Sequence, residues 1–450
     1  MSNTTSARWL GVLALGYFLL LLSQLGLAQN LTNTDDSVLN LSLGPLTVNG
    51  DLTNSFDSTV TVNGSLTGGS LIPSLIVTGN LSNSFGSTIT ASGLLSGGGP
   101  VTPVAIQVDG NLTNDGSSIV QIQNHSVLSV SGNVINSGQF LMGNALGDVG
   151  SNGLAIGGMF INNPGGVLSL NASGDALYTA ALVNAGTINV GNGAVVSISG
   201  ALTQTAGLVD VQQGGSIDPS NYLVNGGTLQ VDGALSALSV TLGSGGLEGM
   251  GNIASAIVNN SGIVEPGTPG APGALTLTGD FTQGAQGTFV EQIGPTSFGA
   301  LLDAGEIGLD GTLEISLQDG YIPPVGAEYL FIDSSGTLSG IFTSIIGSVI
   351  DSSEYFAVVY DPPGYPNAVE LCVVGPGSQG CAAGPIEGGG PSGGGGVPDN
   401  GTAPVASVPE PSSFLLLAGV VLAIACYGRR RYRGSAQVPP LQTKACSCRG

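Results

Sequence analysis

Short segments of alternating hydrophobic and polar residues run along most of the chain. Residues 46–125 contain three similar segments, which read LTVNGDLTNSFDSTVTVNG, LIVTGNLSNSFGSTITASG and IQVDGNLTNDGSSIVQIQN. Apolar residues at every second position, bounded by Gly, Asn, Asp and Ser, predict β-strands joined by tight turns. The equivalent apolar positions are Val48, Val62, Val77, Ala91, Val108 and Ile122. Since each segment is too small to bury its own apolar face, the repeats predict a stacked solenoid.

A second pattern follows, in which two apolar residues precede an Asn and a short Gly turn. The Asn of this pattern occurs as Asn136, Asn162, Asn184, Asn225 and Asn259, and Gln204 takes its place in one variant. Most copies are spaced by about twenty residues, which fits one coil of a solenoid. Stacked coils would place these amides in a hydrogen-bonded ladder. We infer an all-β fold, a right-handed parallel β-solenoid (β-helix) over residues 29–262, with a Greek-key sandwich as the alternative.

The N-terminus has the pattern of a signal peptide. Arg8 supplies the positive charge, Trp9 to Leu22 form an apolar run, and small residues precede the junction of Ala28 and Gln29. We therefore expect residues 1–28 to be removed by cleavage between Ala28 and Gln29. A retained anchor is the alternative, although the run is short for a bilayer, which needs about 20 residues.

The C-terminus combines three features in a fixed order after a linker, residues 375–406, that is rich in Gly and Pro. Pro409, Glu410 and Pro411 come first, and an apolar run from Phe414 to Tyr427 follows. Four arginines then form a stop-transfer cluster: Arg429, Arg430, Arg431 and Arg433. Such a run predicts a single transmembrane helix whose arginines stay on the cytoplasmic side. Residues 434–450 would form a short cytoplasmic tail.

This order of features at residues 407–433 resembles the PEP-CTERM sorting signal. The resemblance implies that Pro409, Glu410 and Pro411 are recognised by exosortase, a membrane transpeptidase of Gram-negative bacteria that make exopolysaccharide. It also implies an exported precursor that is anchored in the inner membrane and then reaches the cell surface or extracellular matrix. An ordinary single-pass anchor is the alternative.

Residues 263–374 differ in pattern from the repeats before them. The segment reading LTLTGDFTQ and the following Gly320-Tyr321-Ile322-Pro323 are similar to the C-terminal part of autotransporter passenger domains. The resemblance implies a β cap on the solenoid, which would protect an open strand edge. Cys372 and Cys381 lie close together in an exported chain, so a disulfide between them is possible, as are two free thiols.

The charges of the chain are separated along its length. Arg8 is the one basic residue before position 429, and all 29 Asp and Glu residues except Glu410 lie between positions 29 and 408. So acidic a surface repels phosphate backbones, which excludes nucleic-acid binding. Divalent cations would be attracted, although plain solubility explains the acids as well.

The same region offers little catalytic chemistry. His125 is the sole histidine, in an expected turn, so nothing supports a Ser-His-Asp triad. The acids are mostly single and in turns (Asp51, Asp57, Asp109, Asp115), apart from the adjacent pair Asp35 and Asp36. We expect no catalytic residue, no metal site and no cofactor. A carboxylate glycosidase remains an alternative, as does ice or polymer binding by threonines at positions 59, 61, 88 and 90.

These patterns predict a non-enzymatic protein that is displayed at the surface or in the matrix. Its expected role is structural or adhesive, and its expected partners are exosortase, the membrane and exopolysaccharide.

Overall fold

The computed structural model describes residues 4–6, 29–41, 45–63, 74–93, 104–143, 148, 150–259, 261–378 and 386–387. Within them the regular structure is almost entirely β-strand, and the one helical element is the 3-10 turn η1 (Gln318–Gly320). The all-β prediction is therefore confirmed. In this part of the chain no helix has the length and apolarity needed to cross a bilayer. Ala28, Cys381, the predicted sorting segment 407–433 and the tail 434–450 lie outside the described residues.

The described strands form two long sheets whose neighbours pair in parallel over most of their length. In the N-terminal coils, one sheet holds two short strands per coil. The first of these strands are β4 (Leu46–Val48), β7 (Ser74–Val77), β10 (Ala105–Val108) and β13 (Val127–Val130). The second are β2 (Asn30–Asn33), β5 (Leu52–Asn54), β8 (Leu81–Asn83), β11 (Leu112–Asn114) and β14 (Val134–Asn136).

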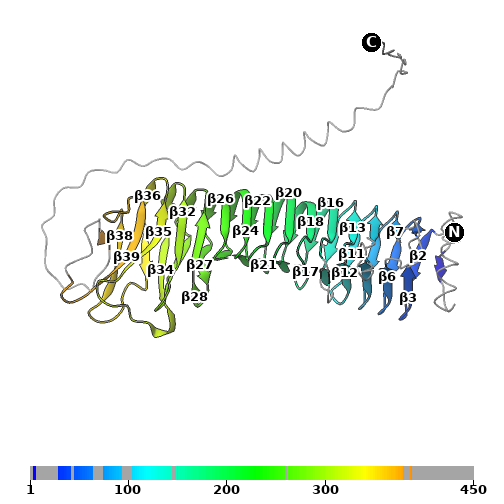
Figure 1. The fold of residues 1–450 in the computed structure, drawn as a ribbon, viewed down its shortest axis with the longest axis horizontal. Coiled ribbons are helices and arrows are strands. Elements are labelled where there is room, and N and C mark those ends of the chain that lie inside the picture. The colour runs from blue at the N-terminus through cyan, green and yellow to red at the C-terminus, as the bar shows by residue number, and fades with distance from the viewer. Residues whose placement is uncertain are drawn as a thin grey trace, which may run out of the picture. The chain divides into compact units, whose positions relative to one another are not determined.

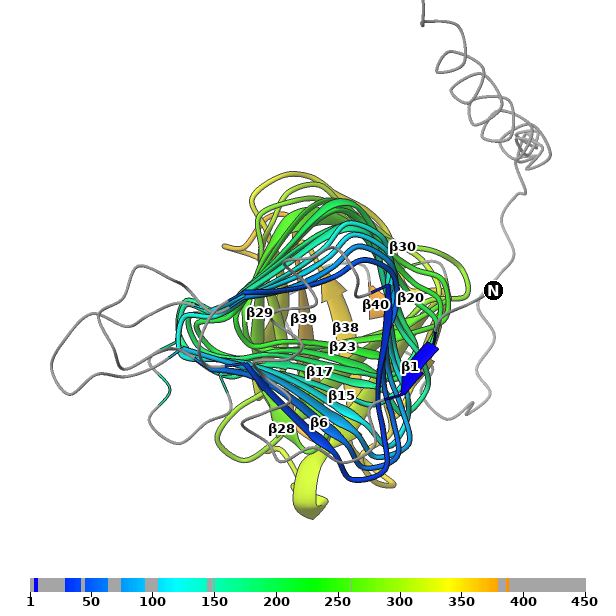
Figure 2. The same cartoon turned by 90° about the vertical axis from the view of Figure 1, so that its right-hand side faces the viewer.

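The second sheet contributes one strand to each coil. In chain order these are β3 (Val38–Leu41), β6 (Thr59–Asn63), β9 (Thr88–Ser92), β12 (Ile119–Gln123), β15 (Gln139–Met142), β17 (Val167–Leu170), β19 (Thr187–Val190), β21 (Leu208–Val211), β23 (Thr228–Val231), β25 (Gly246–Gly249), β27 (Ile263–Thr268), β31 (Thr288–Ile293), β34 (Thr312–Leu317) and β37 (Ser344–Ile346). Figure 1 shows these strands following one another in sequence order, and Figure 2 shows successive coils overlaid around a common interior.

The register of the strands confirms the predicted stacking of repeats. Val48 pairs with Val77, and Val77 pairs with Val108, so equivalent residues of the three segments lie above one another. Val62 belongs to the other sheet, where it pairs with Ala91. The short steps in the sequence therefore separate two strands of one coil, and one full repeat makes one coil. Such long parallel sheets are those of a β-solenoid.

From residue 153 the first two strands of each coil merge into one bent strand. These are β16 (Gly153–Asn162), β18 (Ala176–Asn184), β20 (Val195–Gln204), β22 (Ser216–Val224), β24 (Ala234–Leu242) and β26 (Asn252–Asn259). Leu177 pairs with Val196, and Val196 pairs with Ile217, so each coil here uses about twenty residues, as predicted.

The interior is filled by the apolar residues of the alternating pattern. Leu46, Leu75, Val120, Leu154 and Leu229 are examples of residues that are fully or almost fully buried, and their sequence neighbours point outward. Because side chains alternate across a strand, each coil buries one face of every strand and exposes the other. Stacking, rather than any single coil, therefore creates the core.

A row of buried amides runs along one inner corner of the solenoid, and we call it the amide ladder. Its consecutive members are Asn33, Asn54, Asn83, Asn114, Asn136, Asn162 and Asn184. In each neighbouring pair the Nδ2 group donates to the Oδ1 atom of the next coil at 2.8 or 2.9 Å. The predicted ladder is thus confirmed for Asn136, Asn162 and Asn184, and it extends to four earlier residues that the sequence pattern had not identified.

The predicted place of Asn225 in this ladder is wrong. Gln204 pairs with Val224, which is buried at the ladder position, and Asn225 lies exposed in the following turn. The Tyr222 hydroxyl donates a hydrogen bond to Gln204 Oε1 at 2.6 Å. The acceptor atom of the last amide in the row therefore has a partner. In the next two coils the ladder position holds the buried apolar residues Val224 and Leu242. In the coil after them it holds an amide again, Asn259, which pairs with Leu242.

A second polar row lies at the exposed turns between the first two strands of the early coils. Asn80 Oδ1 accepts a hydrogen bond from Asn111 N at 2.9 Å, and Asn111 Oδ1 accepts one from Asn133 N at 2.8 Å. The glycine before each of these residues allows the coils to approach closely. A Cβ atom on Gly110 would lie 2.6 Å from the carbonyl oxygen of Gly79. This explains why Gly precedes Asp or Asn in every early repeat.

The parallel stack continues beyond Ile263, since β27 pairs with β31 and β31 pairs with β34. The other strands here are β28 (Ala271–Pro272), β29 (Ala274–Leu277), β30 (Phe281–Gln283), β32 (Ala300–Ala304), β33 (Ile307–Leu309), β35 (Glu328–Ser334), β36 (Leu338–Gly340), β38 (Tyr355–Tyr360), β39 (Ala368–Val374) and β40 (Ile386–Glu387). Strand β39 runs antiparallel to both β35 and β38. At the other end, β1 (Thr4–Ser6), within the predicted signal peptide, pairs with β2.

Candidate functional site

The outward side chains of four neighbouring strands line a shallow surface groove. Ser129 of β13 is in register with Ala155 of β16, Ala155 with Tyr178 of β18, and Tyr178 with Ser197 of β20. The residues that precede them in the sequence point inward and are buried, as the alternating pattern requires. The sequence therefore places a column of small side chains, interrupted by one aromatic ring, on the outer face of the stack.

A bend in the long strands β16, β18 and β20 borders the groove on one side. The register between β16 and β18 shifts after Ile156, and that between β18 and β20 shifts after Thr179. The buried Thr179 hydroxyl lies within hydrogen-bonding distance of the carbonyl oxygens of Gly158 (3.1 Å) and Ala181 (3.0 Å). Bulges of this kind bend a strand and redirect its side chains. Gly157, Ala180 and Ser199 each follow a buried residue at these shifts and line the groove.

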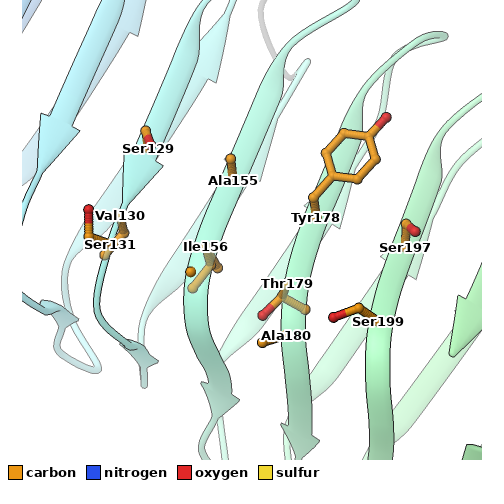
Figure 3. Close-up of a pocket in the computed structure, with 11 residues that line it drawn as sticks. Ser129, Val130, Ser131, Ala155, Ile156, Tyr178, Thr179, Ala180, Ser197 and Ser199 are labelled. Atoms are coloured by element: carbon orange, nitrogen blue, oxygen red, sulfur yellow. The ribbon is translucent and has the colours of Figure 1, made fainter. Parts of the chain in front are cut away.

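The groove has a volume of about 440 Å³, and Tyr178 is its largest exposed side chain, at 55% exposure. Figure 3 shows the Tyr178 ring standing out from its strand, with Ser197 and Ser199 on one side and Ser129 and Ser131 on the other. The residues beside the ring in the groove are small, so both sides of the ring are accessible to a ligand.

The lining residues carry hydroxyl groups but no charge. The nearest carboxylate in the hydrogen-bond network is that of Asp218, whose Oδ2 atom accepts a hydrogen bond from Ser197 Oγ at 3.3 Å. An exposed aromatic face beside hydroxyl groups can pack against the C–H groups of a sugar and bond its hydroxyls. Sequence reasoning did not identify Tyr178, although an aromatic residue at an outward strand position (LYTAA) is a readable signal.

Carboxylates dominate the electrostatics of the opposite sheet. Glu248 of β25 lies directly opposite Glu265 of β27. Partial burial raises the pKa of Glu248, and repulsion from Glu265 and Asp232 raises it further. Burial and the nearby Glu314 likewise raise the pKa of Glu265. Since no Lys or Arg lies between positions 29 and 408, the described solenoid repels anionic ligands.

The candidate residues from the sequence are spread over separate turns. His125 lies in a turn with φ 60°, as expected, and the pair Asp35 and Asp36 forms another left-handed turn. Asp57 and Asp115 belong to turns between the second and third strands of their coils. In the described part of the chain, no three His, Cys, Asp or Glu side chains are grouped to hold a metal ion.

The threonines considered for polymer binding do stack in register. Thr59 pairs with Thr88 and Thr61 with Thr90 between β6 and β9. In the next coil the same positions hold Ile119 and Gln121. The regular threonine array therefore covers two coils.

Cys372 lies on β39, is buried, and is disulfide-bonded. Its predicted partner, Cys381, lies outside the described residues, so the pairing of these two cysteines stays a prediction. Pro409, Glu410, Pro411 and the arginines at 429, 430, 431 and 433 lie outside them as well.

Comparison with known proteins concerns the C-terminal segment. The chain matches no curated protein sequence. Residues 407–431, which include Pro409, Glu410, Pro411 and the first three arginines of the basic cluster, match the family of the PEP-CTERM protein-sorting motif.

Proposed function

We propose that this protein is exported, sorted by exosortase and displayed at the cell surface or in the extracellular matrix. The match of residues 407–431 to the PEP-CTERM protein-sorting motif carries this proposal. The apolar and arginine-rich composition of the same segment supports it, because a stop-transfer helix would hold the precursor in the membrane during processing. The signal-peptide pattern at residues 1–28 provides the route out of the cytoplasm.

The sorting motif itself is tested by a triple substitution of Pro409, Glu410 and Pro411 by alanine. We expect the wild-type protein to lose its C-terminal segment in the native host, and the variant to stay full-length in the membrane fraction. Immunoblotting of cell fractions measures this, with Pro404→Ala as a matched control just outside the motif. Equal processing of the triple variant and the wild type would show that these residues are not the element recognised.

The finer architecture belongs to this proposal. We place a cap over residues 263–374, a flexible linker over 375–406 and one membrane helix before the arginines. The antiparallel pairing of β39 with β35 and β38 supports the cap, because it ends the parallel stack. Right-handed winding is the expected hand for parallel crossovers.

The molecular role we propose is structural or adhesive binding of an uncharged exopolysaccharide, without catalysis. The Tyr178 groove supports it, since its lining combines an exposed ring with hydroxyl groups. A glycosidase would need two carboxyl groups that face the substrate, and the residues lining this groove include none. Release of reducing ends from bacterial polysaccharides would contradict the non-enzymatic role.

Replacing Tyr178 by alanine tests the groove. We expect the affinity for a neutral polysaccharide to fall by about tenfold, because one aromatic contact is lost. Affinity electrophoresis of the full-length protein against neutral and uronic-acid polymers measures this. Tyr178→Phe removes only the hydroxyl and should keep most of the affinity. Unchanged binding by Tyr178→Ala would exclude the groove as the binding surface.

A further inference from the structure

Two exposed phenylalanines form a stacked pair near the N-terminal end of the described solenoid. Phe56 and Phe85 occupy equivalent turns of consecutive coils, and their ring centroids lie 4.8 Å apart with an angle of 2° between the rings. They are 52% and 59% exposed. The centroid distance equals the usual spacing of paired strands, so the rings repeat with the coils. The pair therefore presents a flat aromatic surface that the core does not use.

Both phenylalanines are held in an unfavourable backbone conformation. Phe56 has φ 57° and Phe85 has φ 55°, in the left-handed region that suits Gly or Asn rather than an aromatic residue. Hydrogen bonds between coils keep these turns in place. Asp57 N donates to the Phe85 carbonyl oxygen at 2.9 Å, and Phe85 N donates to Asp115 Oδ2 at 2.7 Å. Strained, exposed and well-fixed residues are more typical of binding surfaces than of stabilising turns.

The next coil does not continue the aromatic column. Its turn has Gly116 at the sequence position equivalent to Phe85, and a Cβ atom there would meet only Ser137 O, at 3.6 Å. The next coil therefore has no side chain at this position that could cover the Phe85 ring. Polar groups border this position, since Asp115 and Ser117 flank Gly116 in the sequence and bond to the Phe85 turn.

Charge restricts what can occupy the position. No Lys or Arg lies between residues 29 and 408. Asp57 follows Phe56 in the sequence, and Asp115 Oδ2 accepts a hydrogen bond from Phe85 N, so an anionic ligand is repelled. A second copy of this chain would bring the same excess of acids. A pyranose ring offers C–H groups to an aromatic face and hydroxyl donors to carboxylates. We propose that Phe56 and Phe85 form a platform on which a sugar ring of an uncharged polysaccharide stacks beside Phe85.

This platform deepens the proposed polysaccharide association, on which it rests, by adding a place distinct from the Tyr178 groove. Phe85→Asn tests it, because Asn tolerates the left-handed backbone and removes the ring. We expect calorimetric titration of the full-length protein with cellohexaose to give at least tenfold weaker binding. The Tm should stay within about 2 °C of the wild type, because relief of the backbone strain offsets the lost stacking.

Two further variants make the result specific. Phe85→Trp restores a ring and should retain binding, and Leu238→Asn, at another exposed apolar position, should leave binding unchanged. Wild-type affinity in Phe85→Asn would overturn the platform; if Tyr178→Ala then weakens binding, the groove and the proposed function stand. Lost binding in Phe85→Asn with normal binding in Tyr178→Ala would support the platform and refute the groove. A wild-type protein that binds no cellohexaose would overturn the platform proposal.

Discussion

Replacing Asn114 by leucine should lower the free energy of unfolding by about 3 kcal/mol, although the two side chains are similar in size. Asn114 is fully buried within the amide ladder. Its Nδ2 group lies 2.9 Å from Asn136 Oδ1 and 3.1 Å from the Gln139 carbonyl oxygen. Its Oδ1 atom accepts a hydrogen bond from Asn83 Nδ2 at 2.8 Å. Leucine would leave these partners buried with fewer hydrogen bonds, and each lost partner costs about 1–3 kcal/mol.

The matched control for this substitution is Asn225→Ala. Asn225 also lies where an alternating strand meets a Gly-containing turn, but its side chain is exposed and outside the ladder. We expect its effect to stay within about 0.5 kcal/mol. Urea denaturation measures both values, and amide hydrogen exchange near Gln139 tests whether the damage is local, as coils of a solenoid can open separately. Equal effects of the two substitutions would contradict a structural role for the ladder.

Leucine is tolerated at the equivalent position of a later coil for a specific reason. Leu242 is in register with Val224 of the preceding coil, and both residues are buried, so two apolar side chains are neighbours there. The last amide before them, Gln204, receives a hydrogen bond from the Tyr222 hydroxyl. The amide row therefore ends with a satisfied acceptor. A single leucine inside the row has no such neighbour, which is why the same residue should destabilise at position 114.

The free energy of unfolding should decrease as the pH rises from about 5 to 8, the reverse of ordinary acid denaturation. Burial raises the pKa of the Glu291 carboxyl well above its ordinary value of 4.5. Burial also raises the pKa values of Asp175, Glu248, Glu265 and Glu370. The folded state therefore holds protons that the unfolded state has already released.

The sign of the pH effect follows from that difference in bound protons. Below pH 4.5, the ordinary carboxyl pKa, both states are protonated and the full stabilisation is present. As the pH rises toward the folded-state pKa of the fully buried Glu291, this group removes about 1.4 kcal/mol of stability per pH unit. The partly exposed carboxyls contribute less, because solvent screens their charges. Thermal unfolding at a series of pH values measures the slope.

Glu291→Gln provides the control, because both oxygens of Glu291 are buried without a hydrogen-bond partner. Glutamine cannot ionise, so the pH dependence of this variant should be flatter than that of the wild type. Added salt should raise the stability at neutral pH, because it screens the repulsion among the acids. A stability that increases from pH 5 to 8 in the wild type would contradict this account.

Much of the candidate site was beyond sequence reasoning, for a common physical reason. Tyr178, Phe56 and Phe85 form candidate binding surfaces only together with residues of adjacent coils. Those residues are about twenty to thirty positions away in the sequence. Coil lengths vary, so the sequence does not state which residues stack. The burial of Glu291 likewise depends on the packing of β31 inside the stack, which a single carboxylate in an apolar segment does not reveal.

The sequence alone determined the strand content, the stacked repeats and three of the seven residues of the amide ladder. Alternation with period two dictates which face is buried, and Gly and Asn dictate the turns, so these features need no tertiary information. It also determined the C-terminal sorting segment, whose features are contiguous in the chain. Only the tertiary structure decided the register between coils. That register places Val224 rather than Asn225 in the ladder, because a shift of one residue moves a side chain from the core to the solvent.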